Sequence, residues 1–129
     1  MAVIGLVEDE AVLRRCLART LERQGHSVRA VETAEEGYVV VSEDRPDLLI
    51  TDLRLPGMSG QDLLEKVKQE YPDTAVIMIT AHGTSEDAAV AQAHGVASYL
   101  RKPIDLAELG QEVERCLPVT VERSRATDA

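Results

Sequence analysis

The sequence alternates five times between a short apolar segment and a longer segment with helical periodicity. Five runs, most of them continuously apolar, have the length of strands: residues 2–7, 26–31, 47–51, 75–80 and 97–101. Such runs are typical of strands covered on both faces of a sheet. They begin 24, 21, 28 and 22 residues apart, about the spacing that right-handed parallel crossovers need. The pattern predicts an α/β fold with an open, doubly wound, five-stranded parallel sheet.

A helical pattern follows each predicted strand. In the first, Leu13, Leu17 and Leu21 share one face, and the pattern stops at Gly25. Caps and stop residues predict the other four helices at residues 34–41, 59–70, 84–94 and 105–117. The fourth is rich in alanine and poor in large apolar side chains, so we expect it to bury little area and to move most easily. An ordinary alanine-rich helix of high propensity is the alternative interpretation.

Length and charge limit the kinds of protein that this chain can be. Its 129 residues suit one domain, which we place at residues 1–117, followed by a polar linker or tail at 118–129. A net charge of -9 argues against direct binding of nucleic acid or of an anionic membrane. Because no apolar run could span a bilayer and the first residues lack a signal-peptide pattern, we expect a cytoplasmic protein. Cys16 and Cys116 lie in apolar helical patterns, and we expect both to be small core residues.

Polar and charged side chains follow four of the predicted strands. Glu8 and Asp9 come after the first, Asp52 after the third, Thr80 ends the fourth, and Lys102 follows the fifth. Because ligands of open parallel sheets bind beyond the carboxyl ends of the strands, we expect these groups to converge. Carboxylate oxygens without His or Cys suit Mg²⁺, for which Mn²⁺ is a substitute. A cation and an ammonium around a carboxylate are what phosphoryl transfer requires.

The acidic triplet at the end of the first strand also has a purely local interpretation. Asp is a good N-cap, and further acidic residues in a first turn are favoured by the helix dipole. Asp9 and Glu10 could therefore simply open the helix that begins near Ala11. Taken alone, the triplet Glu8-Asp9-Glu10 favours this interpretation.

Four motifs carry a resemblance to a known family. They are Glu8-Asp9, TDLRLPGMSG at residues 51–60, TAHG at 80–83 and KPID at 102–105. Together they resemble the receiver domain of two-component response regulators, over residues 2–117. The TAHG and KPID motifs are similar to those of receivers from enhancer-binding, nitrogen-regulation type transcription activators. The resemblance implies a flavodoxin-like strand order of 2-1-3-4-5 with five helices, and a switch controlled by phosphorylation.

The resemblance also implies roles for the residues at the predicted edge. Asp52 would be the phosphoacceptor, and Lys102 would bind the phosphoryl oxygens. Asp9, Asp52 and the backbone carbonyl of Arg54 would bind Mg²⁺ directly, while Glu8 would reach the ion mainly through water.

A second group of residues would report and time the phosphorylation. Thr80 would move its hydroxyl onto the phosphoryl group, and Tyr99 would turn inward behind it. Thr80 could instead be an ordinary β-branched strand end, and Tyr99 a fixed boundary residue with its hydroxyl in water. The resemblance further implies a cis peptide bond before Pro103.

Two side chains would flank the approach of water to the phosphoryl group. Arg54 follows Asp52 by two residues, and His82 follows Thr80 by two residues. We expect Arg54 to shield the phosphoryl group, and leave open whether His82 blocks or orients water. Both could also point into solvent and have no effect on its lifetime.

The resemblance implies a sensor histidine kinase or a phosphotransfer protein as partner, and allows a homodimer on phosphorylation. The chain would catalyse only its own phosphorylation and dephosphorylation. One face of the first helix could contact the kinase or be merely solvated; it carries Arg14, Arg15, Arg19 and Arg23.

Two other function classes fit the expected fold. In a flavodoxin-like electron carrier, a phosphate loop would follow the first strand, whereas here three carboxylates would repel the flavin phosphate. A Mg²⁺-dependent phosphohydrolase would need a second acid two residues after Asp52, where the chain has Arg54.

Overall fold

The computed structural model describes residues 2–81 and 83–117. Five parallel strands form one sheet in the order β2-β1-β3-β4-β5, which confirms the predicted fold class and strand order. The strands are β1 (Val3–Val7), β2 (Ser27–Val31), β3 (Leu48–Asp52), β4 (Ala75–Thr80) and β5 (Ser98–Arg101). The helices are α1 (Ala11–Arg23), α2 (Ala34–Asp44), α3 (Gly60–Glu70), α4 (Ser85–Ala93) and α5 (Leu106–Cys116).

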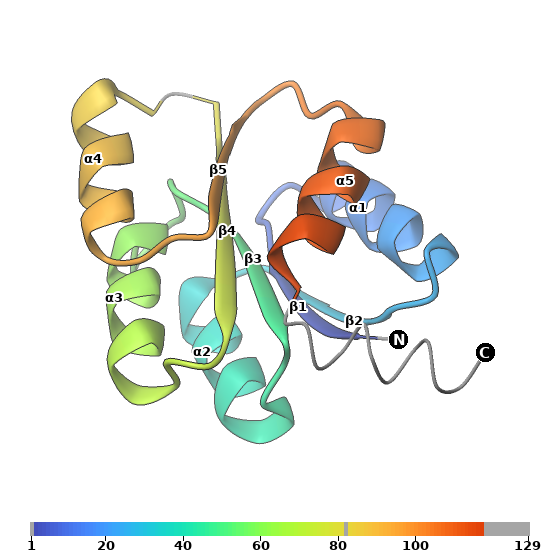
Figure 1. The fold of residues 1–129 in the computed structure, drawn as a ribbon, viewed down its shortest axis with the longest axis horizontal. Coiled ribbons are helices and arrows are strands. Elements are labelled where there is room, and N and C mark those ends of the chain that lie inside the picture. The colour runs from blue at the N-terminus through green and yellow to red at the C-terminus, as the bar shows by residue number, and fades with distance from the viewer. Residues whose placement is uncertain (1, 82, 118–129) are drawn as a thin grey trace.

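The helices cover the two faces of the sheet in two groups (Figure 1). Helices α1 and α5 pack on one face, where Leu17, Leu21 and Leu109 join the apolar side chains of the strands. Helices α2, α3 and α4 cover the other face, through residues such as Leu63 and Ala91. Strand β3 is buried along its whole length, as expected for a central strand covered on both sides.

Side-chain caps fix where four of the helices begin. Thr33 and Asp105 accept hydrogen bonds from backbone N–H groups of the first turns of α2 and α5. Ser59 and Thr84 each form a complete capping box, with an acidic residue at the third helical position. Helix α2 runs three residues beyond its predicted end, because an exposed polar turn continues it to Arg45, whose φ of 47° ends it.

The start of α1 argues against the local interpretation of the acidic triplet. Its N-cap is Glu10, whose side chain makes no capping hydrogen bond within the described part of the chain, and the first turn contains no acidic residue. Capping therefore does not account for the acidic triplet.

Two expectations about α1 are wrong. Cys16 is exposed rather than in the core, because it lies on the side of the helix away from Leu17 and Leu21. Cys116 is partly buried against the core. Arg14 does not point outward: its guanidinium folds back and donates to the carbonyl of Glu8 at 3.0 Å.

Among the described residues, no helix is both long enough and apolar enough to cross a lipid bilayer.

Candidate functional site

The carboxyl edge of the sheet brings the predicted groups together. Glu8 follows the end of β1, and Asp52 and Thr80 are the last residues of β3 and β4. Lys102 follows β5, and its backbone N–H donates to the carbonyl of Thr80 at 2.8 Å. The parallel register places Asp52 beside Ile79 in the neighbouring strand. Strand ends far apart in the sequence thus meet at one place because the strands are parallel and aligned.

Lys102 joins two buried carboxylates. Its Nζ lies 2.6 Å from Asp52 Oδ2 and 2.8 Å from Glu8 Oε1. Both acidic side chains are almost inaccessible to solvent, whereas that of Lys102 retains 18% of its surface. Lys102 is therefore the residue of this trio whose side chain solvent, or a ligand entering from solvent, reaches most easily.

Glu8, Asp9 and Asp52 form an acidic cluster beside this ion pair. Each offers a carboxylate oxygen, and these oxygens lie within 4.8 Å of one another. Asp9 is exposed while the other two are buried, so the cluster opens to solvent on one side. An all-oxygen donor set with one open side fits Mg²⁺, which keeps several of its waters in proteins. The residues present thus suit a magnesium ion.

The electrostatics show why the cluster would take up a cation. Burial raises the pKa of Glu8 above its ordinary value, against the pull of Lys102, and the charge of Asp52 adds to the rise. For Lys102, burial disfavours the charged form, but hydrogen bonds with Asp52 and Glu8 outweigh it and raise its pKa. Lys102 therefore remains an ammonium, and an additional cation would relieve the remaining repulsion among the carboxylates.

The loop after β3 holds Asp52 in place. The Arg54 N–H donates to Asp52 Oδ1 at 3.0 Å, so both carboxylate oxygens of Asp52 accept hydrogen bonds. Gly60, the first residue of α3, packs directly on the backbone here, and a Cβ at this position would overlap the carbonyl oxygen of Asp52. The guanidinium of Arg54 is largely exposed and lies 4.0 Å from Asp87 of α4. The side chain thus extends from the site toward α4.

Two predicted switch residues lie on neighbouring strands. Thr80 is fully buried, and Tyr99 is partly buried against the core cluster that includes Leu63 of α3 and Ala91 of α4. The hydroxyl of Tyr99 is buried and has no hydrogen-bond partner in the part of the chain that the structure describes. The alternative of a boundary tyrosine with its hydroxyl in water is therefore wrong.

Two further predictions concern the loops that enclose the site. The peptide bond between Lys102 and Pro103 is cis, as expected. His82 lies outside the described residues, as does the predicted tail at residues 118–129.

Comparison with known proteins identifies the family. Residues 4–114 match the response regulator receiver domain. The chain belongs to the response regulator receiver family. A similar receiver is that of the transcriptional regulatory protein GlrR of Escherichia coli K12, which is 38% identical over 124 residues, 93% of this chain and 28% of GlrR. The two-component response regulator PhoP of Pseudomonas aeruginosa is 42% identical over 104 residues, 81% of this chain and 46% of PhoP.

Solved receiver structures have the same fold. A response regulator receiver domain from Clostridium thermocellum superposes with a TM-score of 0.86 at 29% identity, covering 98% of this chain and 99% of that one. NtrX from Brucella abortus gives 0.85 at 29% identity over 98% of this chain and 29% of NtrX. The chain thus spans less than half of GlrR, PhoP and NtrX, and it corresponds to their receiver portion.

Three contributors to the receiver site escaped prediction from the sequence. Arg14 pins the acidic loop, Gln61 donates to the backbone carbonyl of Asp87 at 2.9 Å, and Gly83 faces Thr80 and Tyr99. The first two contacts depend on tertiary packing and leave no local signal. Gly83 belongs to the TAHG motif, but only the fold shows what its missing side chain leaves room for.

Proposed function

We propose that this receiver takes a phosphoryl group from a histidine kinase, or from a phosphotransfer protein, onto Asp52. The observation that supports this most strongly is the contact of Lys102 with both Asp52 and Glu8 beside an open acidic cluster. Phosphoryl transfer needs positioning and charge more than covalent help from the protein. The arrangement at the sheet edge supplies both.

In the transfer step, a carboxylate oxygen of Asp52 attacks phosphorus and an O–P bond forms. The P–N bond of the donor phosphohistidine breaks, and its electron pair returns to the imidazole ring. Lys102 donates one ammonium proton to Asp52 and forms an ion pair with Glu8, so its ammonium can also donate to a phosphoryl oxygen. Glu8, Asp9, Asp52 and the Arg54 carbonyl would hold Mg²⁺, which would neutralise charge on the transferring oxygens.

The phosphorylated state would be reported through Thr80 and Tyr99. Thr80 ends the strand beside Asp52, so its hydroxyl can reach a phosphoryl group on that residue. Movement of Thr80 would then change the room available to Tyr99, which packs against the core under α4. The switch would thus pass from the site to the exposed face that α4 and β5 present.

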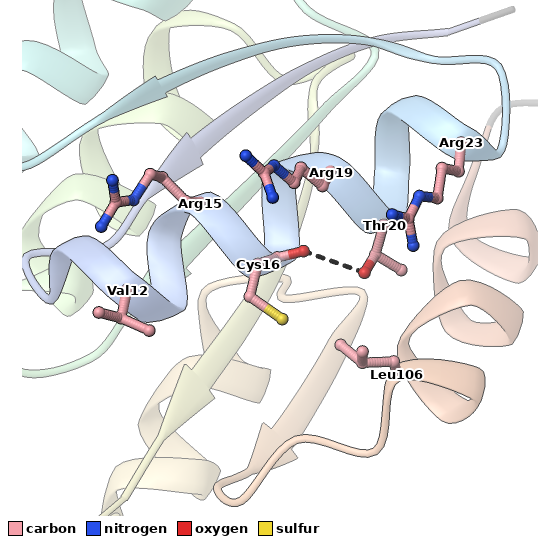
Figure 2. Close-up of a pocket in the computed structure, with 7 residues that line it drawn as sticks. All are labelled: Val12, Arg15, Cys16, Arg19, Thr20, Arg23 and Leu106. Carbon is pink, nitrogen blue, oxygen red and sulfur yellow. Dashed lines mark hydrogen bonds between the residues drawn. The ribbon is translucent and has the colours of Figure 1, made fainter.

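The kinase or phosphotransfer protein would dock on the exposed face of α1 and the start of α5. There, a groove of about 470 Å³ is lined by Arg15, Arg19 and Arg23 and by apolar atoms of Val12 and Leu106. Figure 2 shows Val12 and Cys16 on the side of α1 that faces Leu106, with the arginines along the helix. Because α1 begins two residues after Asp9, a partner bound here lies close to the site.

The docking proposal can be tested separately from the chemistry. Reversing the charge of Arg19 and Arg23 should slow phosphotransfer from the cognate kinase at least about tenfold, because rim charges chiefly control association. Phosphorylation by acetyl phosphate, which needs no docking surface, should be unchanged. Equal slowing with both donors would mean that the variants damage the site rather than the docking surface.

The phosphorylated receiver would control an output domain or a partner rather than act on other substrates. GlrR is a transcriptional regulator of which this chain matches only about a quarter, so transcription control is the output that we propose. The chain would catalyse only its own phosphorylation and dephosphorylation, act in the cytoplasm where kinases are charged by ATP, and form a homodimer when phosphorylated.

A small phosphodonor tests the proposed chemistry. With acetyl phosphate and Mg²⁺, intact-mass spectrometry should show one phosphoryl adduct per chain, and EDTA should abolish it. Asp52→Asn should form no adduct, while Asp73→Asn, at an exposed turn before β4, should behave as wild type. An adduct that survives in Asp52→Asn would overturn the proposal. Continuous phosphate release without an adduct would favour a phosphohydrolase.

A further inference from the structure

Gly83 lies in the loop between Thr80 and the N-cap of α4, Thr84, at a position where space rather than backbone conformation calls for glycine. Its φ is outside the left-handed region that the other loop glycines, Gly25, Gly57 and Gly95, occupy. A Cβ at Gly83 would overlap the Tyr99 hydroxyl oxygen and would come within 2.6 Å of Thr80 Cγ2. The missing side chain thus leaves room for the two switch residues.

Within the described part of the chain, Tyr99 gains no hydrogen bond by lying in this space. Its hydroxyl is buried without a partner among the described residues, and burial raises its pKa above the ordinary value. An unpaired buried hydroxyl is unfavourable, so packing of the ring must offset this cost. A small added group at Gly83 can therefore shift the ring outward, where the hydroxyl meets water.

The contact with Tyr99 is also one that can yield without distorting the backbone. The clashing atom is the far end of the side chain, and the next ring atom, Cζ, would be 3.1 Å from the added Cβ. A Cβ at Gly60, in contrast, would collide with the backbone of Asp52 and Leu53. A substitution at Gly83 is therefore expected to move a side chain, whereas one at Gly60 would disrupt the loop.

We propose that the absence of a Cβ at Gly83 holds Tyr99 inward beside Thr80, so that Gly83 sets the balance between inward and outward positions of the ring. This inference deepens the proposed function and rests on it for its link to phosphorylation. Because Thr80 would contact the phosphoryl group, ring position and phosphoryl binding are coupled, and the coupling is reciprocal. Gly83 is a positioning residue that touches no reacting atom.

The first test follows the ring itself. In wild type without a phosphodonor, NMR should show a nuclear Overhauser effect (NOE) between the ring of Tyr99 and the methyl group of Thr80. Gly83→Ala should lose it. Gly83→Ala combined with Tyr99→Phe should recover it. Without the hydroxyl, the closest approach of the added Cβ to the ring of residue 99 is the 3.1 Å contact with Cζ. The Thr80 contact remains in both variants, so their comparison isolates the hydroxyl.

Gly110→Ala is the matched control. A Cβ at Gly110, in α5, would meet only the mobile amide end of Gln24, so the Tyr99 NOE should persist. Circular dichroism would verify that each variant is folded. An NOE that persists in Gly83→Ala, or one that the double variant fails to recover, overturns the proposal.

The second test measures the coupling. Beryllium trifluoride with Mg²⁺ serves as a phosphoryl analogue, and Gly83→Ala should bind it at least about fivefold more weakly than wild type. The double variant should regain most of the affinity. Unchanged affinity in a variant whose ring has moved overturns the coupling. If wild type binds no beryllium trifluoride at Asp52, the proposed function fails, whereas the NOE comparison still decides the role of Gly83.

Discussion

Helices α3 and α4 begin in the same way but are held in different ways. Each starts with a capping box, Ser59 with Asp62 and Thr84 with Asp87. Four residues of α3 are buried, including Leu63, Leu64 and Val67, whereas in α4 the buried residue is Ala91. Capping decides where a helix starts, and burial of apolar area decides how firmly it is held. The difference suits α4 to move in a switch while α3 keeps the phosphoacceptor loop fixed.

The largest expected effect on stability comes from a substitution in the more deeply buried helix, α3. Leu64→Ala should lower the free energy of unfolding by about 2–5 kcal/mol, because it leaves a cavity beneath α3. Val90→Ala in α4 should change it by no more than about 0.5 kcal/mol, because Val90 is 46% exposed. Urea denaturation measures both. Equal losses would show that α4 is anchored as firmly as α3.

Removing the N-cap of each helix should show whether α3 and α4 differ in how easily they open locally. Ser59→Ala and Thr84→Ala each delete a hydroxyl that accepts a backbone N–H, which costs about 1 kcal/mol. For Ser59 we expect the loss in global stability. For Thr84 we expect faster hydrogen exchange confined to α4, since little buried area couples this helix to the core. A purely global effect of Thr84→Ala would break the distinction.

The starts and ends of these elements were predictable because their signals are local. Thr33, Ser59, Thr84 and Asp105 cap helices that begin within one residue of their predicted starts, and the apolar runs form the strands. The convergence of Glu8 with the other polar groups followed from the parallel order of the strands alone. These inferences need no knowledge of side-chain packing.

The wrong predictions concern side chains whose environment is set by tertiary contacts. Cys16 belongs to an apolar pattern on α1, but it lies exposed in the groove between α1 and the start of α5 rather than in the core. Arg14 was assigned to the outward face although it bonds to the loop that precedes the helix. The space at Gly83 beside Tyr99 becomes visible only when β4, β5 and the loop are placed together. Periodicity identifies a face of a helix, whereas its partner depends on the fold.

Two carboxylates extend the comparison to pH. Burial raises the pKa of Glu8, whereas hydrogen bonds from Thr84, chiefly from its backbone N–H, lower that of Asp87 at the start of α4. Glu8 therefore opposes folding increasingly as the pH rises from the ordinary value of 4.5 through its raised pKa. Asp87 supports folding above its ordinary value of 3.8, and this support is lost as the pH falls through its lowered pKa.

Glu8→Gln should thus stabilise the metal-free protein at neutral pH, and the gain should shrink on acidification. Asp87→Asn should destabilise it at neutral pH, with the loss vanishing at low pH. Thermal unfolding between about pH 3 and 8 measures the sign of the stability change in both variants. A Glu8→Gln variant that is less stable at neutral pH would show that its ion pair with Lys102 outweighs the burial of its carboxylate.

The smallest effect concerns Arg54, whose side chain reaches from the loop before α3 toward α4. Arg54 extends past Asp52 to a point 4.0 Å from Asp87, with most of its surface exposed. A long cation in this position can lie across the path of water to a phosphoryl group on Asp52. Because an exposed ion pair contributes at most about 1 kcal/mol, Arg54→Ala should speed loss of the phosphoryl group by no more than about fivefold.

The decay rate of the phosphorylated protein under fixed Mg²⁺ measures this effect, with His82→Ala, whose sign we leave open, and wild type in parallel. Asp87→Asn separates two ways in which Arg54 could act. If Asp87 positions Arg54, its loss should speed decay as Arg54→Ala does, because the guanidinium is no longer drawn toward α4 across the entrance. If Arg54 shields by its length alone, decay of Asp87→Asn should match wild type. Identical decay in all four proteins would mean that neither Arg54 nor His82 controls the access of water.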